Sequence, residues 1–295
     1  MTGPEHKAGF VNILGNPNVG KSTLMNKLIG QNLSIITSKA QTTRHRILGI
    51  LNGEGYQIVF SDTPGILKPR YVLQESMLKA AASALEDADM LLLVITPEDD
   101  TLSADGFFER IVECKAQKII VINKIDLSSQ DALEQLVAKW NQLLPGAPVV
   151  PVSAKHDFNL STLLRLIVNN LPAGEPYFPE DQLSDRFERF FASEIIREKI
   201  LLNYRKEIPY SVEVEIESYN ESPDLISISA IIHVERTSQK GIVIGHRGEM
   251  LKKTGTMARA GLEDFLGRKV FLTLRVRVTE DWRHKQRMMK QFGYQ

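Results

Sequence analysis

Eight residues near the start of the chain have the composition and spacing of a phosphate-binding loop. Gly15 to Ser22 reads Gly-Asn-Pro-Asn-Val-Gly-Lys-Ser and fits the pattern G-x-x-x-x-G-K-[ST]. In such a loop, backbone N–H groups surround a polyphosphate beside the positive end of a helix dipole. The Lys21 ammonium would reach the β- and γ-phosphates, and the Ser22 hydroxyl would be a ligand for Mg²⁺. Glycine turns before helices also match by chance, so the neighbouring motifs decide what the pattern means.

A second group, Asp62-Thr63-Pro64-Gly65, follows an apolar run. The Asp62 carboxylate can hold a water molecule on Mg²⁺. Gly65 has no side chain, so its N–H can approach a γ-phosphate closely. The next residue is Ile66, at a position where Ras-like enzymes have a glutamine that orients the attacking water. Isoleucine cannot form that hydrogen bond, so we expect slow intrinsic hydrolysis unless another group positions the water.

Two further groups predict which base is bound. In Asn123-Lys124-Ile125-Asp126, the Asp126 carboxylate can accept two hydrogen bonds from the Watson–Crick edge of guanine. Adenine has no such pair of donors and would leave a buried carboxylate unpaired, so we expect GTP. Lys124 is expected along the base plane, and Asn123 is expected to join this segment to the phosphate loop. In Ser153-Ala154-Lys155, the Ala154 N–H is expected to face the guanine oxygen.

These motifs all follow segments that are predicted to be strands. Apolar runs at 10–14, 47–52, 56–61, 90–96, 118–122 and 148–152 alternate with helical patterns at 23–29, 72–85, 106–114, 131–144 and 160–171. Apolar strands that alternate with helices predict an α/β fold, with a mainly parallel sheet and helices on both faces. Ligands of such sheets bind at the carboxyl ends of the strands, and the motifs lie at those ends.

In this order and spacing, the motifs resemble those of P-loop GTPases of the translation-factor class. The resemblance implies catalytic roles for Lys21, Thr43 and Gly65. It implies Mg²⁺ as a cofactor, held by Ser22, by Thr43 (with Thr42 as the alternative) and, through water, by Asp62. The implied GTP-binding residues are Gly15, Asn16, Pro17, Asn18, Val19, Gly20, Lys21, Ser22, Thr23, Asp62, Thr63, Pro64, Gly65, Ile66, Asn123, Lys124, Asp126, Ser153, Ala154 and Lys155. Asn18 resembles an asparagine with which some relatives hold K⁺, so K⁺-stimulated hydrolysis is expected.

A proline-rich stretch then divides the chain. Residues 171–184 contain Pro172, Pro176 and Pro179 and show little periodicity, which predicts a linker. We therefore place a G domain at 1–172, a linker at 173–184 and a second domain at 185–295. The pattern of the second domain predicts a helix at 185–205, capped by Ser184 or Asp185, and then a hairpin of strands 211–219 and 225–234. Helices at 238–244 and 250–266 are expected on either side of Gly245-His246-Arg247-Gly248. A strand at 269–278 and a basic helix from Asp281 complete the domain.

This element order, with a G-x-x-G loop between two helices, resembles an α+β type II KH domain. In KH modules the loop clamps the backbone of about four unpaired nucleotides. The domain is also basic: the chain from Lys240 onward has 13 Lys and Arg against 5 Asp and Glu, although the whole chain is neutral. Such a local charge favours a polyanionic partner. The expected RNA-binding residues are Lys240, Ile242, Ile244, Gly245, His246, Arg247, Gly248, Lys252, Lys253 and Arg283.

Composition excludes several other classes. Hydrophobic residues make up 43% and charged residues 24% of 295 residues, and no apolar run is long enough for a membrane span. The chain has one cysteine, which excludes a disulfide within one chain and a zinc site built from cysteines.

Over almost its whole length the chain resembles the Era-type GTPases, bacterial GTPases with a C-terminal KH domain. The resemblance implies a cytoplasmic, monomeric switch that binds GTP and GDP, binds the 3′ end of 16S rRNA and acts in assembly of the 30S subunit. It also implies a peripheral association with the inner membrane. Two alternatives stay open: an RNA-binding or chaperone protein whose G domain binds nucleotide with negligible hydrolysis, and a tRNA-modification GTPase, although the C-terminal cysteine usual in that class is missing.

Overall fold

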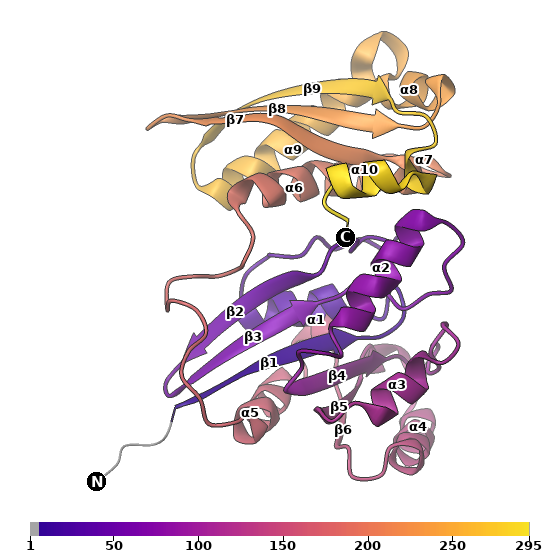
Figure 1. Cartoon of the computed structure of the whole chain (residues 1–295), viewed down its shortest axis with the longest axis vertical. Coiled ribbons are helices and arrows are strands. Elements are labelled where there is room, and N and C mark those ends of the chain that lie inside the picture. The colour runs from indigo at the N-terminus through magenta and orange to yellow at the C-terminus, as the bar shows by residue number, and fades with distance from the viewer. Residues whose placement is uncertain (1–5, 295) are drawn as a thin grey trace. The chain divides into compact units, whose positions relative to one another are not determined.

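The structure is a computed structural model that describes residues 6–294 and forms two compact units (Figure 1). The first unit extends to Asp185, apart from the short segments Ile35–Thr42 and Tyr71–Leu73, which group with the second unit. The second unit otherwise begins at Arg186. Within the described residues, neither unit has a helix that is long and apolar enough to cross a membrane.

The first unit is built on a sheet with the strand order β2-β3-β1-β4-β5-β6 (Figure 1). Its strands are β1 (Lys7–Leu14), β2 (Ile47–Gly53), β3 (Tyr56–Asp62), β4 (Met90–Ile95), β5 (Gln117–Ile122) and β6 (Val149–Pro151). β2 and β3 form an antiparallel hairpin, and the other pairs are parallel. The six predicted apolar runs and the mainly parallel sheet are confirmed.

Helices cover both faces of this sheet. They are α1 (Lys21–Ile29), α2 (Val72–Ser83), α3 (Phe107–Glu113), α4 (Gln130–Leu143) and α5 (Leu160–Asn170). On one face, Ala81 of α2, Ile111 of α3 and Trp140 of α4 share a hydrophobic cluster with Leu93 of β4. On the other face, α1 packs so closely on β2 that a Cβ at Gly49 would lie 2.3 Å from the Ile29 side chain.

The stretch predicted to be a linker packs along the edge strand β2. The Ile50 N–H donates to the Leu183 carbonyl (2.9 Å), and the Ser184 hydroxyl donates to the Leu48 carbonyl (2.5 Å). The Asp185 carboxylate in turn accepts from the Leu48 N–H (3.3 Å). These bonds satisfy backbone groups that an edge strand would otherwise expose. The predicted capping role of Ser184 or Asp185 is therefore wrong: the next helix begins at Glu188, and no side chain caps it.

The second unit has a sheet in the order β7-β8-β9, packed against helices. Its elements are α6 (Glu188–Asn203), α7 (Ile208–Ser211), β7 (Glu213–Glu221), β8 (Leu225–Val234), α8 (Thr237–Ile244), the 3₁₀ turn η3 (His246–Gly248), α9 (Glu249–Leu266) and β9 (Lys269–Val278). β7 and β8 form the predicted antiparallel hairpin, and β9 lies parallel to β8 along its whole length. This is the α+β arrangement expected of a type II KH domain.

The end of the chain differs from the predicted basic helix. A 3₁₀ turn, η4 (Trp282–His284), comes first, and α10 (Gln286–Gln291) follows. Asp281 has a left-handed backbone (φ 53°), which changes the chain direction before η4. Trp282 is buried, and its indole N–H donates to the Ser211 carbonyl (2.9 Å). Trp282 therefore has a packing role and is not available to stack on a base.

Candidate functional site: a nucleotide site and a KH groove

The phosphate loop connects β1 to α1, as the pattern predicted. Lys21 is the first residue of α1, and its ammonium donates to the carbonyls of Gly15 (2.9 Å) and Asn16 (2.8 Å). Burial lowers the pKa of Lys21 to about 8, although Asp62 and Asp99 oppose this shift. Lys21 is therefore mostly charged at neutral pH and lies where the loop surrounds a phosphate group.

Three residues that are far apart in the sequence meet beside this loop. The Ser22 hydroxyl donates to Asp62 Oδ2 (2.6 Å) and lies 2.9 Å from the Thr43 hydroxyl, which in turn lies 3.3 Å from the same carboxylate oxygen. The Thr42 hydroxyl instead bonds to Thr37 Oγ1 and to the Lys39 carbonyl, both at 2.6 Å. The structure thus brings together the three residues predicted to hold Mg²⁺ and favours Thr43 over Thr42.

Asp62 has an unusual environment. Its side chain is fully buried, which raises its pKa above the ordinary value for aspartate even though Ser22 and Lys21 act in the opposite direction. Its second oxygen, Oδ1, is buried and has no hydrogen-bond partner among the described residues. A buried carboxylate oxygen without a partner is costly unless something binds to it. This charge and this free oxygen suit a hydrated divalent cation.

The segment after Asp62 touches the phosphate loop. A Cβ at Gly65 would lie 2.6 Å from the backbone nitrogen of Pro17, so only glycine allows this approach. The Ile66 N–H donates to the Gly15 carbonyl (3.0 Å). The Ile66 side chain is fully buried in the cluster that contains Leu14 and Ala81. Thr63 has a structural role, because its hydroxyl donates to the Ile13 carbonyl (2.7 Å).

The predicted base-binding motifs also meet at the ends of their strands. Asn123 donates to the Val19 carbonyl (2.8 Å), which confirms that it joins this segment to the phosphate loop. The Ser153 hydroxyl donates to Asp126 Oδ1 (2.6 Å) and lowers the pKa of that carboxyl group. Ser153 therefore holds Asp126 ionised and fixes its orientation. Lys124, which lies between Asn123 and Asp126 in the sequence, has a left-handed backbone (φ 61°).

Two details of this part of the site differ from the sequence prediction. The Ala154 N–H, expected to face the guanine oxygen, donates to Asn123 Oδ1 (3.0 Å). His156 was not predicted, yet its Nε2 lies 3.6 Å from Asp126 Oδ2. The sequence could have indicated this role, because His156 directly follows Lys155 of the predicted base-binding motif.

Asn16 and Asn18 of the loop play different parts. The Asn16 carboxamide donates to Asp99 Oδ1 (2.7 Å) and to the Thr101 carbonyl (2.6 Å), so it joins the loop to the segment after β4. Asn18 has a left-handed backbone (φ 65°) and an exposed side chain. The phosphate loop therefore presents Asn18, and not the Asn16 side chain, to solvent.

In the second unit, the glycine loop forms the turn between α8 and α9. Gly245 has φ 74°, and a Cβ there would lie 2.7 Å from Met250 Cβ. Arg247 and Gly248 also have positive φ values, and nothing lies within 4 Å of a Cβ at Gly248. The loop therefore exposes its backbone together with the side chains of His246 and Arg247.

A groove runs from this loop along α9 and β9. It is lined by Gly248, Leu251, Lys252, Gly255, Thr256, Arg259, Leu272 and Leu274. Lys252 was predicted to bind RNA, whereas Thr256 and Arg259 were not. These three residues follow one another at helical spacing, and this spacing could have indicated the other two. Among the predicted RNA-binding residues outside the groove lining, Ile242 and Lys253 are exposed, and Lys240 and Ile244 are half-buried.

Arg283 is placed elsewhere. Its guanidinium forms an ion pair with Glu235 and lines a different pocket, between the ends of β8 and β9. Val243, between Ile242 and Ile244, is fully buried in the core of the unit. Position in the sequence could not reveal the pairing of Arg283, because it depends on which strand ends are adjacent.

Comparisons with known proteins agree with this arrangement. A family model described as "50S ribosome-binding GTPase" matches residues 10–124, and a KH-domain model matches residues 207–283. The chain is 45% identical over 297 residues to the GTPase Era of Geotalea uraniireducens (strain Rf4), and 45% identical over 299 residues to that of Geotalea daltonii (strain DSM 22248 / JCM 15807 / FRC-32). Both alignments cover all of this chain and all of the relative.

Two solved structures are similar over nearly the whole chain. One is Era in complex with MgGDPNP and nucleotides 1506–1542 of 16S ribosomal RNA, with 40% identity and a TM-score of 0.94, covering 98% of this chain and 99% of that chain. The other is an Aquifex aeolicus Era variant bound to GDP·AlF4⁻, with 40% identity and a TM-score of 0.92, covering 98% of this chain and 99% of that chain.

Proposed function

Because the chain belongs to the family of the GTPase Era, we propose that it is a GTP-hydrolysing switch that binds the 3′ end of 16S rRNA and acts in assembly of the 30S ribosomal subunit. The observation that carries this proposal is the combination, in one chain, of the hydrogen-bonded cluster of Ser22, Thr43 and Asp62 with an open groove beside a G-x-x-G loop. The first is suited to a magnesium-bound nucleotide and the second to single-stranded RNA.

The residues beside the phosphate loop fit Mg²⁺. Asp62 Oδ1 is buried without a partner among the described residues, and the hydroxyls of Ser22 and Thr43 gather at Oδ2. Ser22 and Thr43 would hold the ion directly, and Asp62 through a water molecule. When bound, Mg²⁺ neutralises charge on the β- and γ-phosphates and so favours attack by water.

The chain's own groups bind and orient the nucleotide. Lys21 would exchange its contacts with the two loop carbonyls for contacts with phosphate oxygens. The Gly65 N–H lies beside the phosphate loop and would detect the γ-phosphate. Asp126, held ionised by Ser153, would accept the two guanine donors. These groups account for binding GTP in preference to ATP.

Intrinsic hydrolysis is proposed to be slow. Ile66 follows Gly65 where a water-positioning glutamine occurs in other GTPases, and its side chain is buried in the core. It therefore has neither the chemistry nor the position to orient water. Binding of RNA or of the small subunit would have to order another group for rapid turnover.

Stimulation by K⁺ is a second proposal on the same step. Asn18 is exposed on the phosphate loop with a left-handed backbone, and its carboxamide oxygen has the chemistry of a K⁺ ligand. The expected result is faster hydrolysis in K⁺ than in Na⁺ buffer for the natural chain, and no difference for Asn18→Ala. Equal rates for the natural chain in the two buffers would remove the proposal.

RNA would bind along the groove of the second unit. Gly245 and Gly248 let a phosphate backbone approach the loop, and Arg247, Lys252 and Lys253 would neutralise phosphates. Leu272 and Leu274 form an apolar wall against which bases can pack. Arg283 is not part of this proposal, because Glu235 already pairs with it.

The two sites would be linked through the segment that carries Thr43. GTP with Mg²⁺ would order residues 37–46 and the segment after Gly65, which favours a state that binds RNA. Hydrolysis would release these segments and the RNA, as γ-phosphate switches do. Since the proposed partner is the small ribosomal subunit, the proposed place of action is the cytoplasm. A monomeric state and a peripheral association with the inner membrane are part of the same proposal.

Multiple-turnover GTP hydrolysis tests the proposal. The rate would be measured alone and with 30S subunits, 50S subunits, tRNA or an RNA copying the 3′ end of 16S rRNA. Acceleration by 30S subunits and by the 16S RNA supports it. Binding of GTP without turnover under every condition would favour a nucleotide-binding RNA chaperone, and selective acceleration by tRNA or by 50S subunits would contradict the proposed partner.

A further inference from the structure

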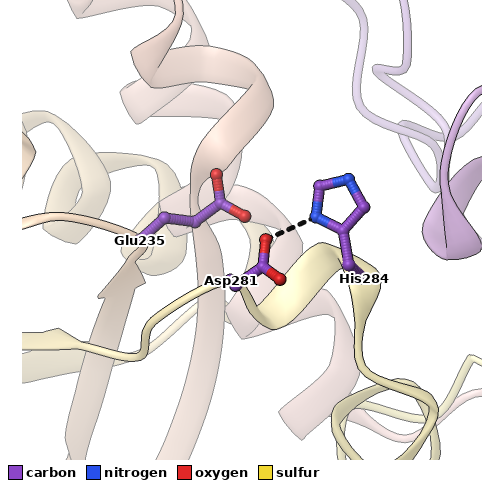
Figure 2. A group of neighbouring side chains, drawn as sticks. All are labelled: Glu235, Asp281 and His284. Carbon is purple, nitrogen blue, oxygen red and sulfur yellow. Dashed lines mark hydrogen bonds and ion pairs between the residues drawn. The ribbon is translucent and has the colours of Figure 1, made fainter.

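Three potential metal ligands meet at one end of the second unit, and none of them belongs to the proposed nucleotide site or RNA groove. Glu235 directly follows β8, and Asp281 and His284 follow β9. β8 and β9 run in parallel register up to the pair Val234 and Val278, so the segments that follow them start at the same edge. One ligand atom from each of the three side chains lies within 4.8 Å of the other two, and Figure 2 shows the side chains converging.

Glu235 gives the strongest indication that something binds here. Its side chain is 8% exposed, and one oxygen, Oε2, accepts a hydrogen bond from Arg283 (2.5 Å). The other oxygen, Oε1, is buried and has no hydrogen-bond partner among the described residues. Buried carboxylate oxygens are nearly always bound to a donor or a cation. In Figure 2 the Glu235 carboxylate is directed toward the other two side chains.

The other two side chains are accessible. Asp281 Oδ1 and His284 Nδ1 are 2.6 Å apart, and both side chains are exposed (63% and 45%). They line the pocket that also contains Glu235 and Arg283. An ion from solvent can therefore reach the group, with one buried ligand at the base of the pocket and two exposed ligands at its mouth.

We propose that Glu235, Asp281 and His284 form a binding site for a divalent transition-metal ion of the Zn²⁺ class. Two carboxylate oxygens and one imidazole nitrogen give three protein ligands and leave a fourth position for water, which is a ligand set that Zn²⁺ accepts. Imidazole disfavours Mg²⁺ and Ca²⁺, which take oxygen ligands. Arg283 pairs with Glu235 Oε2, which leaves the buried Oε1 as the oxygen without a partner among the described residues.

The ion would have a structural effect on the proposed RNA site. Glu235 lies two residues before the start of α8, and its N–H donates to Gln239 Oε1 (2.9 Å) within that helix. α8 ends at the G-x-x-G loop. A metal that joins Glu235 to Asp281 and His284 would tie the beginning of α8 to the C-terminal segment and stabilise both.

Zinc binding to the full chain tests the proposal, with Mg²⁺ and GDP in excess so that the nucleotide site is filled. Zn²⁺ would be titrated in competition with a chromophoric chelator for the natural chain and for Asp281→Asn, His284→Gln and Glu235→Gln. His246→Gln, which removes an exposed histidine of the glycine loop, is the matched control. We expect one Zn²⁺ per natural chain, a Kd raised at least about tenfold in each ligand variant, and an unchanged Kd in the control.

The exposed positions of Asp281 and His284 make these variants suitable, since their unfolding temperature without Zn²⁺ should equal that of the natural chain. Zn²⁺ should raise that temperature in the natural chain and in His246→Gln, but not in His284→Gln. Equal zinc affinity in the natural chain and in the Asp281→Asn/His284→Gln double variant would overturn the site. So would the absence of Zn²⁺ binding in the presence of this excess of Mg²⁺, or a rise in unfolding temperature that inorganic phosphate produces and Zn²⁺ does not.

Discussion

In the first unit, the residues proposed to hold magnesium are buried or half-buried and bonded to one another, whereas in the second unit the charged residues proposed to hold RNA are exposed. Ser22, Thr43 and Asp62 already share hydrogen bonds, and burial raises the pKa of Asp62. His246, Arg247 and Lys253 point into solvent from a loop and a helix. A nucleotide site selects one small ligand and requires fixed geometry, while an RNA groove depends on an open backbone and on charge.

This difference predicts that substitutions in the nucleotide site lower GTP hydrolysis without lowering stability. Substitutions in the groove should alter RNA binding with little effect on the binding of nucleotide. Each of the following substitutions tests one side of that contrast.

The largest effect is expected from Asp62→Asn. The substitution removes the charge that would hold a magnesium-bound water, so GTP hydrolysis should fall at least about 100-fold, the size of effect seen when one electrostatic group is lost from a preorganised site. Stability without Mg²⁺ should not fall, because burial raises the pKa of Asp62 and its charge therefore destabilises the folded state as pH rises above the usual aspartate value. Turnover and thermal unfolding would be measured together. Asp105→Asn, at an exposed carboxylate paired with Lys68, is the control; a clear loss of stability in Asp62→Asn would contradict this account.

Thr43→Val and Thr42→Val form a matched pair in the same segment. Valine keeps the shape of threonine and removes the hydroxyl. Thr43→Val should lower the rate of hydrolysis about tenfold and raise the Mg²⁺ concentration for half-maximal rate, because its hydroxyl lies 2.9 Å from that of Ser22. Thr42→Val should leave the Mg²⁺ dependence unchanged, since its hydroxyl bonds to Thr37 and Lys39. The reverse pattern would show that Thr42 is the ligand.

In the second unit, Gly245→Ala and Gly248→Ala should differ in stability. Gly248 has a left-handed backbone (φ 82°, ψ 6°), which costs an alanine roughly 1–2 kcal/mol. Gly245 (φ 74°, ψ 178°) lies in a region that essentially only glycine adopts. At Gly245 the new Cβ would also lie 2.7 Å from Met250 Cβ, whereas at Gly248 it meets nothing within 4 Å. Urea unfolding should therefore show a larger loss of stability for Gly245→Ala, and equal losses would contradict this difference between the two positions.

A smaller effect should appear in the pH dependence of nucleotide binding. Burial lowers the pKa of Lys21 to about 8 in the free protein, and phosphate contact should raise it. The affinity for GDP is then highest below pH 8, where Lys21 is protonated before the nucleotide binds. It falls as pH rises above 8, by at most about tenfold per pH unit. Lys21→Arg keeps its charge and should lose this extra slope, while ionisation of the nucleotide affects both proteins equally. Parallel pH profiles for the two proteins would argue against a titrating Lys21.

The same contrast explains how much the sequence could predict. The phosphate loop, Asp62, Asn123 and Asp126 belong to short motifs whose geometry is local, because each ends one strand of a parallel sheet. Thr43 could be placed with them from the family resemblance. The pairing of Ser153 with Asp126 required the structure, because 27 residues separate them.

Other features could not be predicted, because tertiary contacts decide them. Ser184 and Asp185 have ideal capping side chains, but the edge strand β2 binds them. Leu272 and Leu274 alternate like core residues of β9, yet they also line the groove. Glu235 and His284 come together only through the parallel pairing of β8 with β9. In each case the pattern was consistent with several partners, and only the fold selects one.

The central claim is that one chain couples a nucleotide switch to an RNA groove, and fluorescence anisotropy tests it most directly. A labelled RNA copying the 3′ end of 16S rRNA would be titrated with the chain bound to a non-hydrolysable GTP analogue or to GDP. Gly248→Asp places a negative charge where a phosphate is proposed to lie, and Gly248→Asn is the neutral control, because both residues tolerate a left-handed backbone. The account predicts tight binding that depends on the nucleotide, retained in large part by Gly248→Asn and lost in Gly248→Asp, with GTP binding unchanged in both. Equal RNA affinity with the GTP analogue and with GDP would contradict the switch, and equal affinity in Gly248→Asp and Gly248→Asn would contradict the groove.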